Sequence, residues 1–395
     1  MRATLFLLVL VLHAGSAAGR QTIPPGREAG ASFEQALAGD GGRPAMGPLL
    51  RRRIPEGDSL WAVALRIHFD AIVVDGHADT PTLMTDFGYD LGARHRSFES
   101  HVDLPRMREG GLDGVFFSIW VPTGYGEGRA AYERARTMIA EVRRQVALYP
   151  ADAGLAASSR EVVSLARAGR RAILLGLEGA HALAGREDLA DSLFEAGIRY
   201  ITLTHVRANS FADASQSAAR WNGLSGAGRR LVQRLNWLGI LIDLSHVSDK
   251  TARDVLEISR APVILSHSSA RVLTDHVRNV NDDLIRGVAA SGGVVMVNFY
   301  DLLVNREPGL RAAALEDVIA HIDHVARTAG IEHVGLGSDF DGARMPSGLE
   351  DVTLLPWITR GLLELGYDER ALRLMLGGNV LRVLDQARAL HDMAR

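Results

Sequence analysis

The sequence predicts an α/β protein folded as a (β/α)8 barrel, the TIM-barrel architecture, and three observations support this prediction. Short apolar runs recur along the chain, and segments with helical periodicity separate them. The runs are apolar throughout instead of alternating, which is typical of parallel strands covered on both faces. Chemically active side chains gather at the C-terminal ends of the runs, where barrels of this kind build their active sites.

Eight such runs occur, and eight parallel strands joined by helices form the pattern of a closed barrel. They cover residues 71–79, 114–121, 172–180, 200–206, 239–246, 262–267, 293–300 and 333–340. Residues 159–170 and 315–330, which lie between runs, have the spacing of amphipathic helices. His321 and His324 lie three residues apart on the second of these helices, and the pattern favours a solvated face for both.

Residues 1–19 have the pattern of a signal peptide. Arg2 gives a short positive segment, an apolar run follows over residues 5–12, and small residues complete the pattern. This run is far shorter than the ~20 residues that span a bilayer, so the pattern favours export over a transmembrane helix. We therefore expect a periplasmic or secreted protein. The C-terminal residues lack a hydrophobic tail, which predicts no stable membrane anchor.

Residues 20–56 are rich in Gly, Pro and Arg, and we interpret them as an N-terminal linker or arm. One barrel domain is expected over residues 57–395, with Asp58 or Ser59 capping a first helix that runs through His68. The net charge of −3 provides no basic field for nucleic acid. Cys is absent, which excludes disulfides, thiolate ligands and a Cys nucleophile.

Polar residues at the ends of the runs are the candidate functional side chains. They are His77 and Asp79 in the first run, Glu178 in the third, His205 in the fourth, His246 in the fifth, His267 in the sixth, Tyr300 in the seventh and Asp339 in the eighth. Three histidines and two carboxylates without Cys form a nitrogen and oxygen site that suits Zn²⁺, with Mn²⁺, Co²⁺ or Fe²⁺ as alternatives. Five ligands exceed the three protein ligands of an ordinary catalytic zinc, so we predict two metals and a bridging water.

We interpret Glu178 as the bridging ligand, with His77 and Asp79 on one metal and His246 and His267 on the other. An HxD pair alone would equally suit a capping Asp beside a chance His. Glu178 is more informative, because an ionised carboxylate that follows an apolar run requires a cationic partner. A carboxylated lysine cannot replace it, since the only Lys of the chain lies within a predicted helix.

Several motifs, in order from about residue 70 to 384, resemble those of the membrane (renal) dipeptidase family of dizinc peptidases in its bacterial, exported form. They are DGHADT, EGAH, THVRAN, GILIDLSHVS, PVILSHSSA, RNVNDD, VMVNFY, GSDFDG and GGNVLRVL. The resemblance implies a TIM barrel of the amidohydrolase type, two Zn²⁺ per chain, dipeptide substrates and a homodimer.

The family's roles transfer by motif to the residues of this chain. The metal ligands fall on the five residues already identified: His77, Asp79, Glu178, His246 and His267. The resemblance further implies that His205 polarises the scissile carbonyl, Arg278 binds the substrate carboxylate, Asp339 transfers the proton and Tyr300 lines the pocket. By pattern alone, an ordinary surface ion pair is the favoured interpretation of Arg278, and a neutral core position remains open for His205. Asn281 stands where the family often has proline, which affects the loop after Arg278.

The expected function is therefore a zinc-dependent dipeptidase. A metal-bridging hydroxide would hydrolyse L-Xaa-L-Xaa dipeptides, with L-Xaa-D-Xaa as a further substrate class. The alternative is a binuclear metal amidohydrolase that acts on another small carboxylated amide, a lactone or a β-lactam. A third hypothesis, an exported binding or scaffold protein without catalysis, is disfavoured because all five ligands and Asp339 are present.

Overall fold

The structure, a computed structural model, describes residues 58–394, and the predicted signal peptide and arm lie outside them. Over this range the strands form one parallel sheet, in the order β2-β1-β9-β8-β7-β6-β5-β4-β3, and a further pairing of β2 with β4 closes eight of them into a barrel. The strands are β1 (Val73–Ala78), β2 (Leu112–Trp120), β3 (Ala153–Leu155), β4 (Arg171–Glu178), β5 (Ile198–Thr202), β6 (Leu241–Asp243), β7 (Val263–Leu265), β8 (Val294–Val297) and β9 (Val334–Leu336). The predicted (β/α)8 barrel is confirmed.

Each of the eight predicted runs overlaps one barrel strand, although β2, β4 and β5 begin one or two residues before their runs, and β3 is an addition. It pairs with Arg171–Ile173 at the start of β4, whereas β5 pairs with the end of the same strand. Because β2 lies along the other edge of β4, β3 and β5 share one edge. This short strand therefore extends the sheet at one end without joining the ring.

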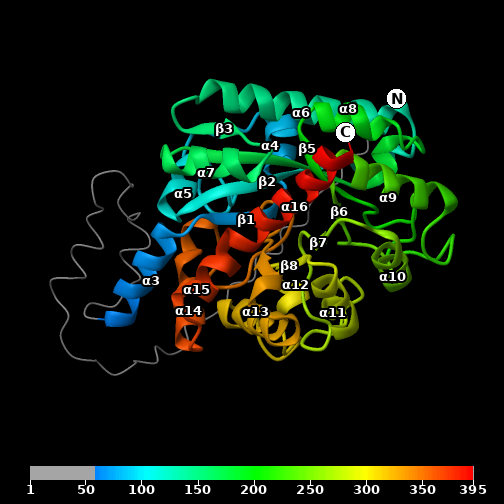
Figure 1. Ribbon diagram of the computed structural model, residues 1–395. Helices are drawn as coiled ribbons and strands as arrows, with labels where there is room; N and C mark the ends of the chain where they lie inside the picture. The colour runs from blue at the N-terminus through cyan, green and yellow to red at the C-terminus, as the bar shows by residue number, and fades with distance from the viewer. Residues whose placement is uncertain (1–57, 395) are drawn as a thin grey trace.

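Helices surround the barrel, as Figure 1 shows. They are α3 (Ser59–Asp70), α4 (Thr80–Phe87), α5 (Leu104–Glu109), α6 (Arg129–Leu148), α7 (Ser159–Arg167), α8 (Leu189–Glu195), α9 (Gly226–Leu238), α10 (Asp249–Ile258), α11 (Asp282–Ala290), α12 (Asp301–Val304), α13 (Leu315–Ala329), α14 (Pro356–Glu364), α15 (Glu369–Arg373) and α16 (Asn379–Ala394). The expected helices correspond to α3, α7 and α13, and Asp58 caps α3 through the amides of Leu60 and Trp61. Among the described residues, no helix combines the length and apolarity needed to cross a membrane.

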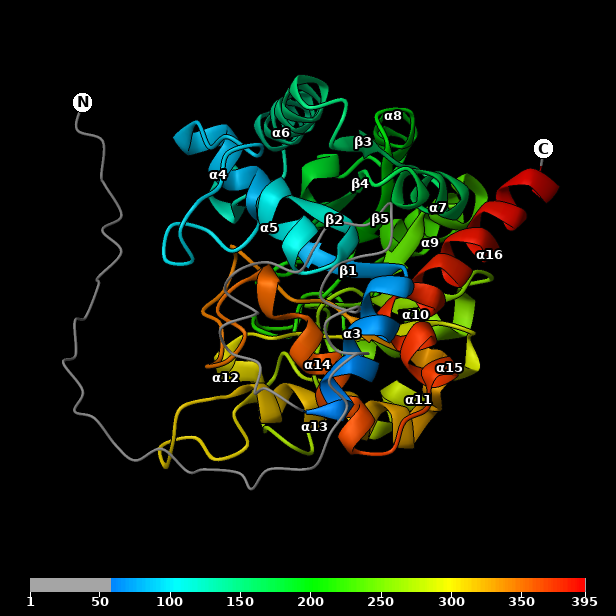
Figure 2. The same cartoon turned by 90° about the vertical axis from the view of Figure 1, so that its left-hand side faces the viewer.

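Helix α16 covers the N-terminal end of the barrel. Its apolar residues join the cluster of strand side chains that includes Phe116, Tyr200 and Met296. Arg382 on α16 donates to the carbonyls of Gly292 and Glu332, which lie two residues before the start of β8 and of β9. In Figure 2, α3 lies beside α14 and α15. The helical cover at this end leaves the C-terminal rim as the accessible mouth.

Most predicted functional residues lie just beyond their strands. His77 and Glu178 fall inside β1 and β4, but His246 and Asp339 each follow their strand by three residues. Both adopt left-handed backbone conformations, with φ of 68° and 65°. Such conformations are uncommon for non-glycine residues and concentrate at functional sites. The strand ladder therefore ends before the chain turns these side chains into the mouth of the barrel.

Candidate active site

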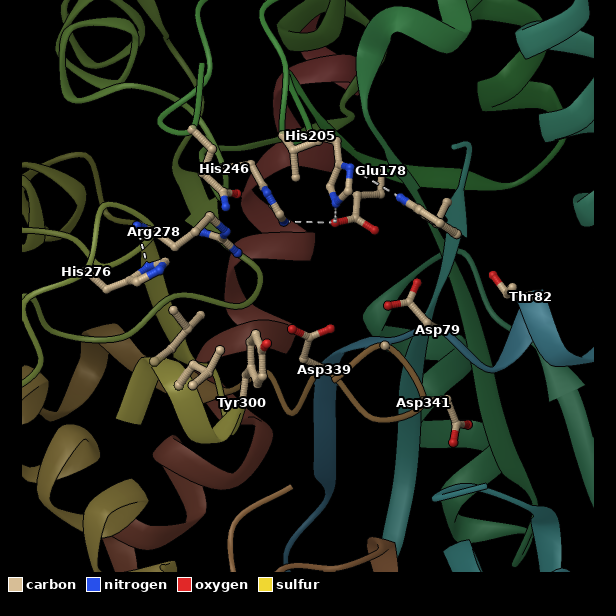
Figure 3. A pocket seen from close by; sticks show the side chains of 16 residues that line it. Asp79, Thr82, Glu178, His205, His246, His276, Arg278, Tyr300, Asp339 and Asp341 are labelled. Carbon is tan, nitrogen blue, oxygen red and sulfur yellow. Dashed lines mark hydrogen bonds and ion pairs between the residues drawn. The ribbon is translucent and has the colours of Figure 1, made fainter. Parts of the chain in front are cut away.

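A cavity of about 420 Å³ opens at the C-terminal rim. Its walls bring together predicted residues from six strand ends (Figure 3): Asp79, Glu178, His205, His246, Tyr300 and Asp339, with Arg278 from the loop after β7. His77 and His267 lie beneath the cavity and are fully buried. The structure therefore brings all the predicted site residues into one region.

Glu178 lies at the centre of the cluster, and its two carboxylate oxygens face different histidines. Oε2 lies 3.5 Å from His77 Nε2 and accepts a hydrogen bond from Ser118. Oε1 lies 3.0 Å from His246 Nε2 and 3.5 Å from His267 Nε2. A carboxylate with an imidazole group on each side has the arrangement of a bridging ligand between two cations.

Partners behind two of the rings determine which nitrogen faces Glu178. Tyr200 Oη lies 2.8 Å from His77 Nδ1, and Ser266 Oγ lies 2.7 Å from His267 Nδ1. Ser266 in turn donates to Asp243. These contacts leave Nε2 of each ring directed at the carboxylate, as in metal sites where a hydrogen bond at the second nitrogen orients the imidazole.

Asp79 is available as a ligand. It occupies the N-cap position of α4, but its side chain makes no capping hydrogen bond, so the capping alternative does not apply. Asp79 Oδ2 lies 3.6 Å from His77 Nε2. Burial and the charge of Glu178 raise the pKa of Asp79 to about 7. The ionised form of Asp79 is therefore disfavoured unless a positive charge lies nearby.

The donor set fits divalent metal ions. Three overlapping groups of side chains have ligand atoms within 4.8 Å of one another: His77, Glu178 and His267; Glu178, His205 and His246; His77, Asp79 and Asp339. His77 Nε2 and Asp79 Oδ1 are buried without a hydrogen-bond partner. Burial and the charge of Arg278 hold the pKa of His246 well below its ordinary value, so its ring is neutral and has a lone pair to offer.

His205 also lies near Glu178, with 3.8 Å between Nε2 and Oε1. Its tautomer indicates another role. The indole nitrogen of Trp120 can only donate, and it contacts His205 Nδ1 at 3.4 Å. Nδ1 is therefore an acceptor and Nε2 carries the proton. Burial lowers the pKa of His205, so the ring is a neutral hydrogen-bond donor.

Arg278 is buried, which excludes the surface ion pair. Its Nη2 donates to the carbonyl of His267 at 3.1 Å, and its Nη1 contacts Ser268 Oγ at 3.4 Å. The salt bridges found among the described residues do not include Arg278, although it lines the cavity. The guanidinium is therefore free to bind an anionic group that enters.

Asp339 is held from behind by Asn298, whose amide donates to Oδ2 at 2.9 Å. Gly342 follows on the same loop, and a Cβ there would lie 2.0 Å from Asp79 Oδ2 and 2.7 Å from Asp339 Oδ1. A side chain at this position would displace both carboxylates. The Asn298 amide binds Oδ2, so Oδ1 of Asp339 remains available and lies next to Asp79.

Comparisons with known proteins agree with this geometry. The model of the membrane dipeptidase family, peptidase family M19, matches residues 62–395. Dipeptidase verJ of Clonostachys rogersoniana is 37% identical over 343 residues, which cover 83% of this chain and 87% of that protein. Dipeptidase tcpJ of Claviceps purpurea is 35% identical over 353 residues, covering 87% and 78%.

The chain belongs to the membrane dipeptidase family. A solved metallo peptidase from Rhodobacter sphaeroides, liganded with a phosphinate mimic of the dipeptide L-Ala-D-Ala, is 29% identical with a TM-score of 0.73. The match covers 80% of this chain and all of that one. Three predictions are therefore confirmed: the family, the barrel fold and the enzyme class. The protein is a metal-dependent dipeptidase.

Sequence reasoning missed the side chains that support this dipeptidase site. Tyr200, Ser118 and Asn298 each contact a candidate ligand or Asp339, and His276 lines the cavity beside Arg278. Asn298 follows the apolar run of β8 directly, so its position in the VNFY motif was an available signal. Tyr200 and Ser118 lie within apolar strands and offered none.

Proposed function

We propose that this protein hydrolyses dipeptides with two zinc ions per chain. His77 and Asp79 would hold one ion, His246 and His267 the other, and Glu178 both. The observation that carries the proposal is the division of the Glu178 oxygens between separate histidines, next to a cavity with one buried guanidinium. When bound, the metals would supply a water nucleophile of lowered pKa and an electrophile for the carbonyl.

Arg278 selects the substrate. Its planar guanidinium can bind the terminal carboxylate with two parallel hydrogen bonds, at fixed depth beside the metal ligands. A peptide bond one residue away from that carboxylate would then lie above Glu178. Longer peptides would place a different bond there, so chains of two residues are preferred. Tyr300, which lines the same cavity, borders the second substrate residue.

His205 and Asp339 act on the reacting atoms. The Nε2–H group of His205 donates a hydrogen bond to the carbonyl oxygen as negative charge develops there. Asp339 accepts the proton of the attacking water and passes it to the leaving amine. The Asn298 amide occupies Oδ2 of Asp339 and so fixes the orientation of the carboxylate during both transfers.

The substrate class comprises L-Xaa-L-Xaa and L-Xaa-D-Xaa dipeptides. Support for the second comes from the Rhodobacter sphaeroides relative, which was solved with a mimic of L-Ala-D-Ala. We further propose that the protein is an exported homodimer, in the periplasm or outside the cell. The pattern of residues 1–19 and the family resemblance support this part. N-terminal sequencing of the mature protein and light scattering would test export and assembly.

The deciding experiment compares wild type with Asp339→Asn. Asn keeps the shape and tolerates the left-handed backbone at this position. We expect about two zinc ions per chain in both proteins by elemental analysis. Hydrolysis of L-Ala-L-Ala and L-Ala-D-Ala should fall by about 10²-fold or more in the variant, because the proton acceptor is lost.

Other outcomes would change specific parts of the proposal. Two metals without dipeptide cleavage would move the function to another small carboxylated amide, a lactone or a β-lactam. Full activity in Asp339→Asn would remove the proton-transfer role. Absence of metal in a folded wild-type protein would contradict the ligand set itself.

A further inference from the structure

His321 on α13 is fully buried and contacts two segments that build the substrate cavity. Its Nδ1 accepts a hydrogen bond from the amide of Ala270 at 3.0 Å. Its Nε2 lies 3.2 Å from both the carbonyl of Val304 and Thr274 Oγ1. The sequence predicted a solvated face here, and for His321 that prediction was wrong.

The hydrogen-bond partners fix the tautomer of His321. Because Nδ1 accepts from an amide N–H, Nε2 carries the proton and donates to the carbonyl of Val304. The hydroxyl of Thr274 donates to the carbonyl of Asn305 at 3.1 Å, so toward His321 it acts as a second acceptor. Both ring nitrogens are therefore used, and neither is free for proton transfer.

The two connected segments carry the proposed substrate contacts. Residues 266–281, the Arg278 loop, run from β7 to α11. Tyr300 is the N-cap of α12, the single turn that ends at Val304. Asn279, next to Arg278, adds a second tie, because its amide donates to the carbonyls of Thr274 at 2.9 Å and Leu303 at 2.8 Å.

Together with the bond from Thr274 to the carbonyl of Asn305, the contacts of His321 and Asn279 connect the Arg278 loop to α12 and the residue after it. The ties therefore decide how far Arg278 and Tyr300, which line the same cavity, lie from each other. We propose that His321, with Asn279, is a positioning residue for recognition of the substrate's C-terminal carboxylate. The inference rests on the proposed role of Arg278 as the carboxylate site.

Two substitutions separate the ties of His321. In His321→Gln the side-chain amide reaches the place of Nε2 and keeps the bond to Val304. In His321→Asn the amide reaches only the place of Nδ1, so the contact with Ala270 remains and the tie to α12 is lost. We expect Gln to preserve carboxylate recognition and Asn to lose it.

The readout is the ratio of kcat/KM for L-Ala-L-Ala to that for its C-terminal amide, which lacks the carboxylate. Wild type should prefer the free acid by at least about tenfold, the usual order for a charged pair that loses one partner. In His321→Asn this preference should fall about tenfold through KM, with kcat retained, whereas His321→Gln should stay within about threefold of wild type. A general loss of folding would lower both activities alike and leave the ratio unchanged.

Thr274→Val provides a second variant of nearly the same shape that removes only the hydroxyl between His321 and Asn305. It should lower the acid preference in the same direction by about threefold. His68→Asn is the matched control. His68 is equally buried and makes two hydrogen bonds, one to Thr359 in α14 and one to the carbonyl of Gly110, which lies before the start of β2. Its substitution should reduce thermal stability without changing the ratio.

The outcomes separate the two proposals. If wild type does not prefer the free acid, the role of Arg278 fails, and that of His321 with it. A wild-type preference that survives intact in both His321→Asn and Thr274→Val overturns the role of His321 alone. Equal losses on acid and amide in these variants also overturn it.

Discussion

His77 contributes to the site through one nitrogen only, because Tyr200 occupies the other. The tyrosine ring fits inside the barrel beside Gly176, where a Cβ would lie 2.0 Å from the ring. Burial raises the pKa of the Tyr200 hydroxyl, so it stays protonated and can accept from Nδ1–H without adding charge. The orientation of this candidate ligand therefore depends on a glycine in β4 and a tyrosine in β5.

Tyr200→Phe should weaken metal binding by about tenfold, because the ring keeps its packing but His77 loses the partner that orients it. Competition with a chromophoric chelator would measure the affinity. Tyr132→Phe is the control, since the hydroxyl of Tyr132 on α6 makes an exposed hydrogen bond with Ser192 on α8, away from the site. Wild-type affinity in Tyr200→Phe would show that packing alone orients His77.

The candidate ligands were predictable from sequence because each follows an apolar run, and parallel strands converge at one rim. Their supporting partners were not predictable, because a Tyr or Ser inside an apolar strand looks like any other core residue. His321 left a readable signal: it falls on the same face of α13 as Val318 and Val325, both fully buried. The apolar residues on that face indicate that His321 is buried and not solvated.

Strands were predictable where they lie in a longer apolar run. Strands β6, β7 and β9 have three residues each, as β3 does, but each overlaps such a run, whereas β3, with the sequence AGL, has none to mark it. Its pairing follows from the free edge at the start of β4, which is a tertiary property. Asn281 illustrates a related limit: it caps α11 and also donates to Asp249, so the departure from proline is accommodated by side-chain contacts.

A buried ion pair connects two loops near the mouth. Arg106 in α5 lies 2.6 Å from Asp103 and 3.1 Å from Asp351, and all three side chains are almost fully buried. Asp351 is the N-cap of the short helix η4 (Val352–Leu354), so the pair connects the chain before β2 with the chain after β9.

Arg106→Met should lower the free energy of unfolding by about 3 kcal/mol, because two carboxylates would remain buried without their cation. Urea denaturation would measure the change. Arg66→Ala offers a contrast, since its pair with Glu369 is exposed and should contribute less than about 1 kcal/mol. Equal effects of the two substitutions would contradict the importance of burial.

At the scale of the whole molecule, the described residues that stabilise the barrel and those that form the site lie toward opposite ends of the barrel axis. The N-terminal end is covered by α16, and His68 there is buried between α14 and the chain before β2. The C-terminal rim carries the cavity and the positive-φ residues His246 and Asp339. This polarity was predictable, because the fold class itself assigns chemistry to one end.

Acid should destabilise the protein through histidines that are buried in neutral form. Burial lowers the pKa of His68 and of His321 to about 4, from an ordinary value near 6.5. Below pH 6.5 the unfolded chain binds protons at these histidines that the folded chain does not bind. Their contribution to the free energy of unfolding is therefore fully present above pH 6.5 and is lost as the pH drops from about 6.5 to about 4. Each group contributes a slope of up to about 1.4 kcal/mol per pH unit.

Removing one such histidine should therefore flatten the pH dependence. Between pH 7 and pH 5, His68→Gln should lose about 1–2 kcal/mol less unfolding free energy than wild type, measured by urea denaturation at both values. All other titrating groups, including the candidate metal ligands, are common to both proteins and cancel in the difference. Ser225→Ala, which removes the N-cap of α9 but no titrating group, should cost about 1 kcal/mol equally at the two pH values. A His68→Gln curve parallel to wild type would mean that His68 has the same pKa in the folded and the unfolded chain, despite its burial.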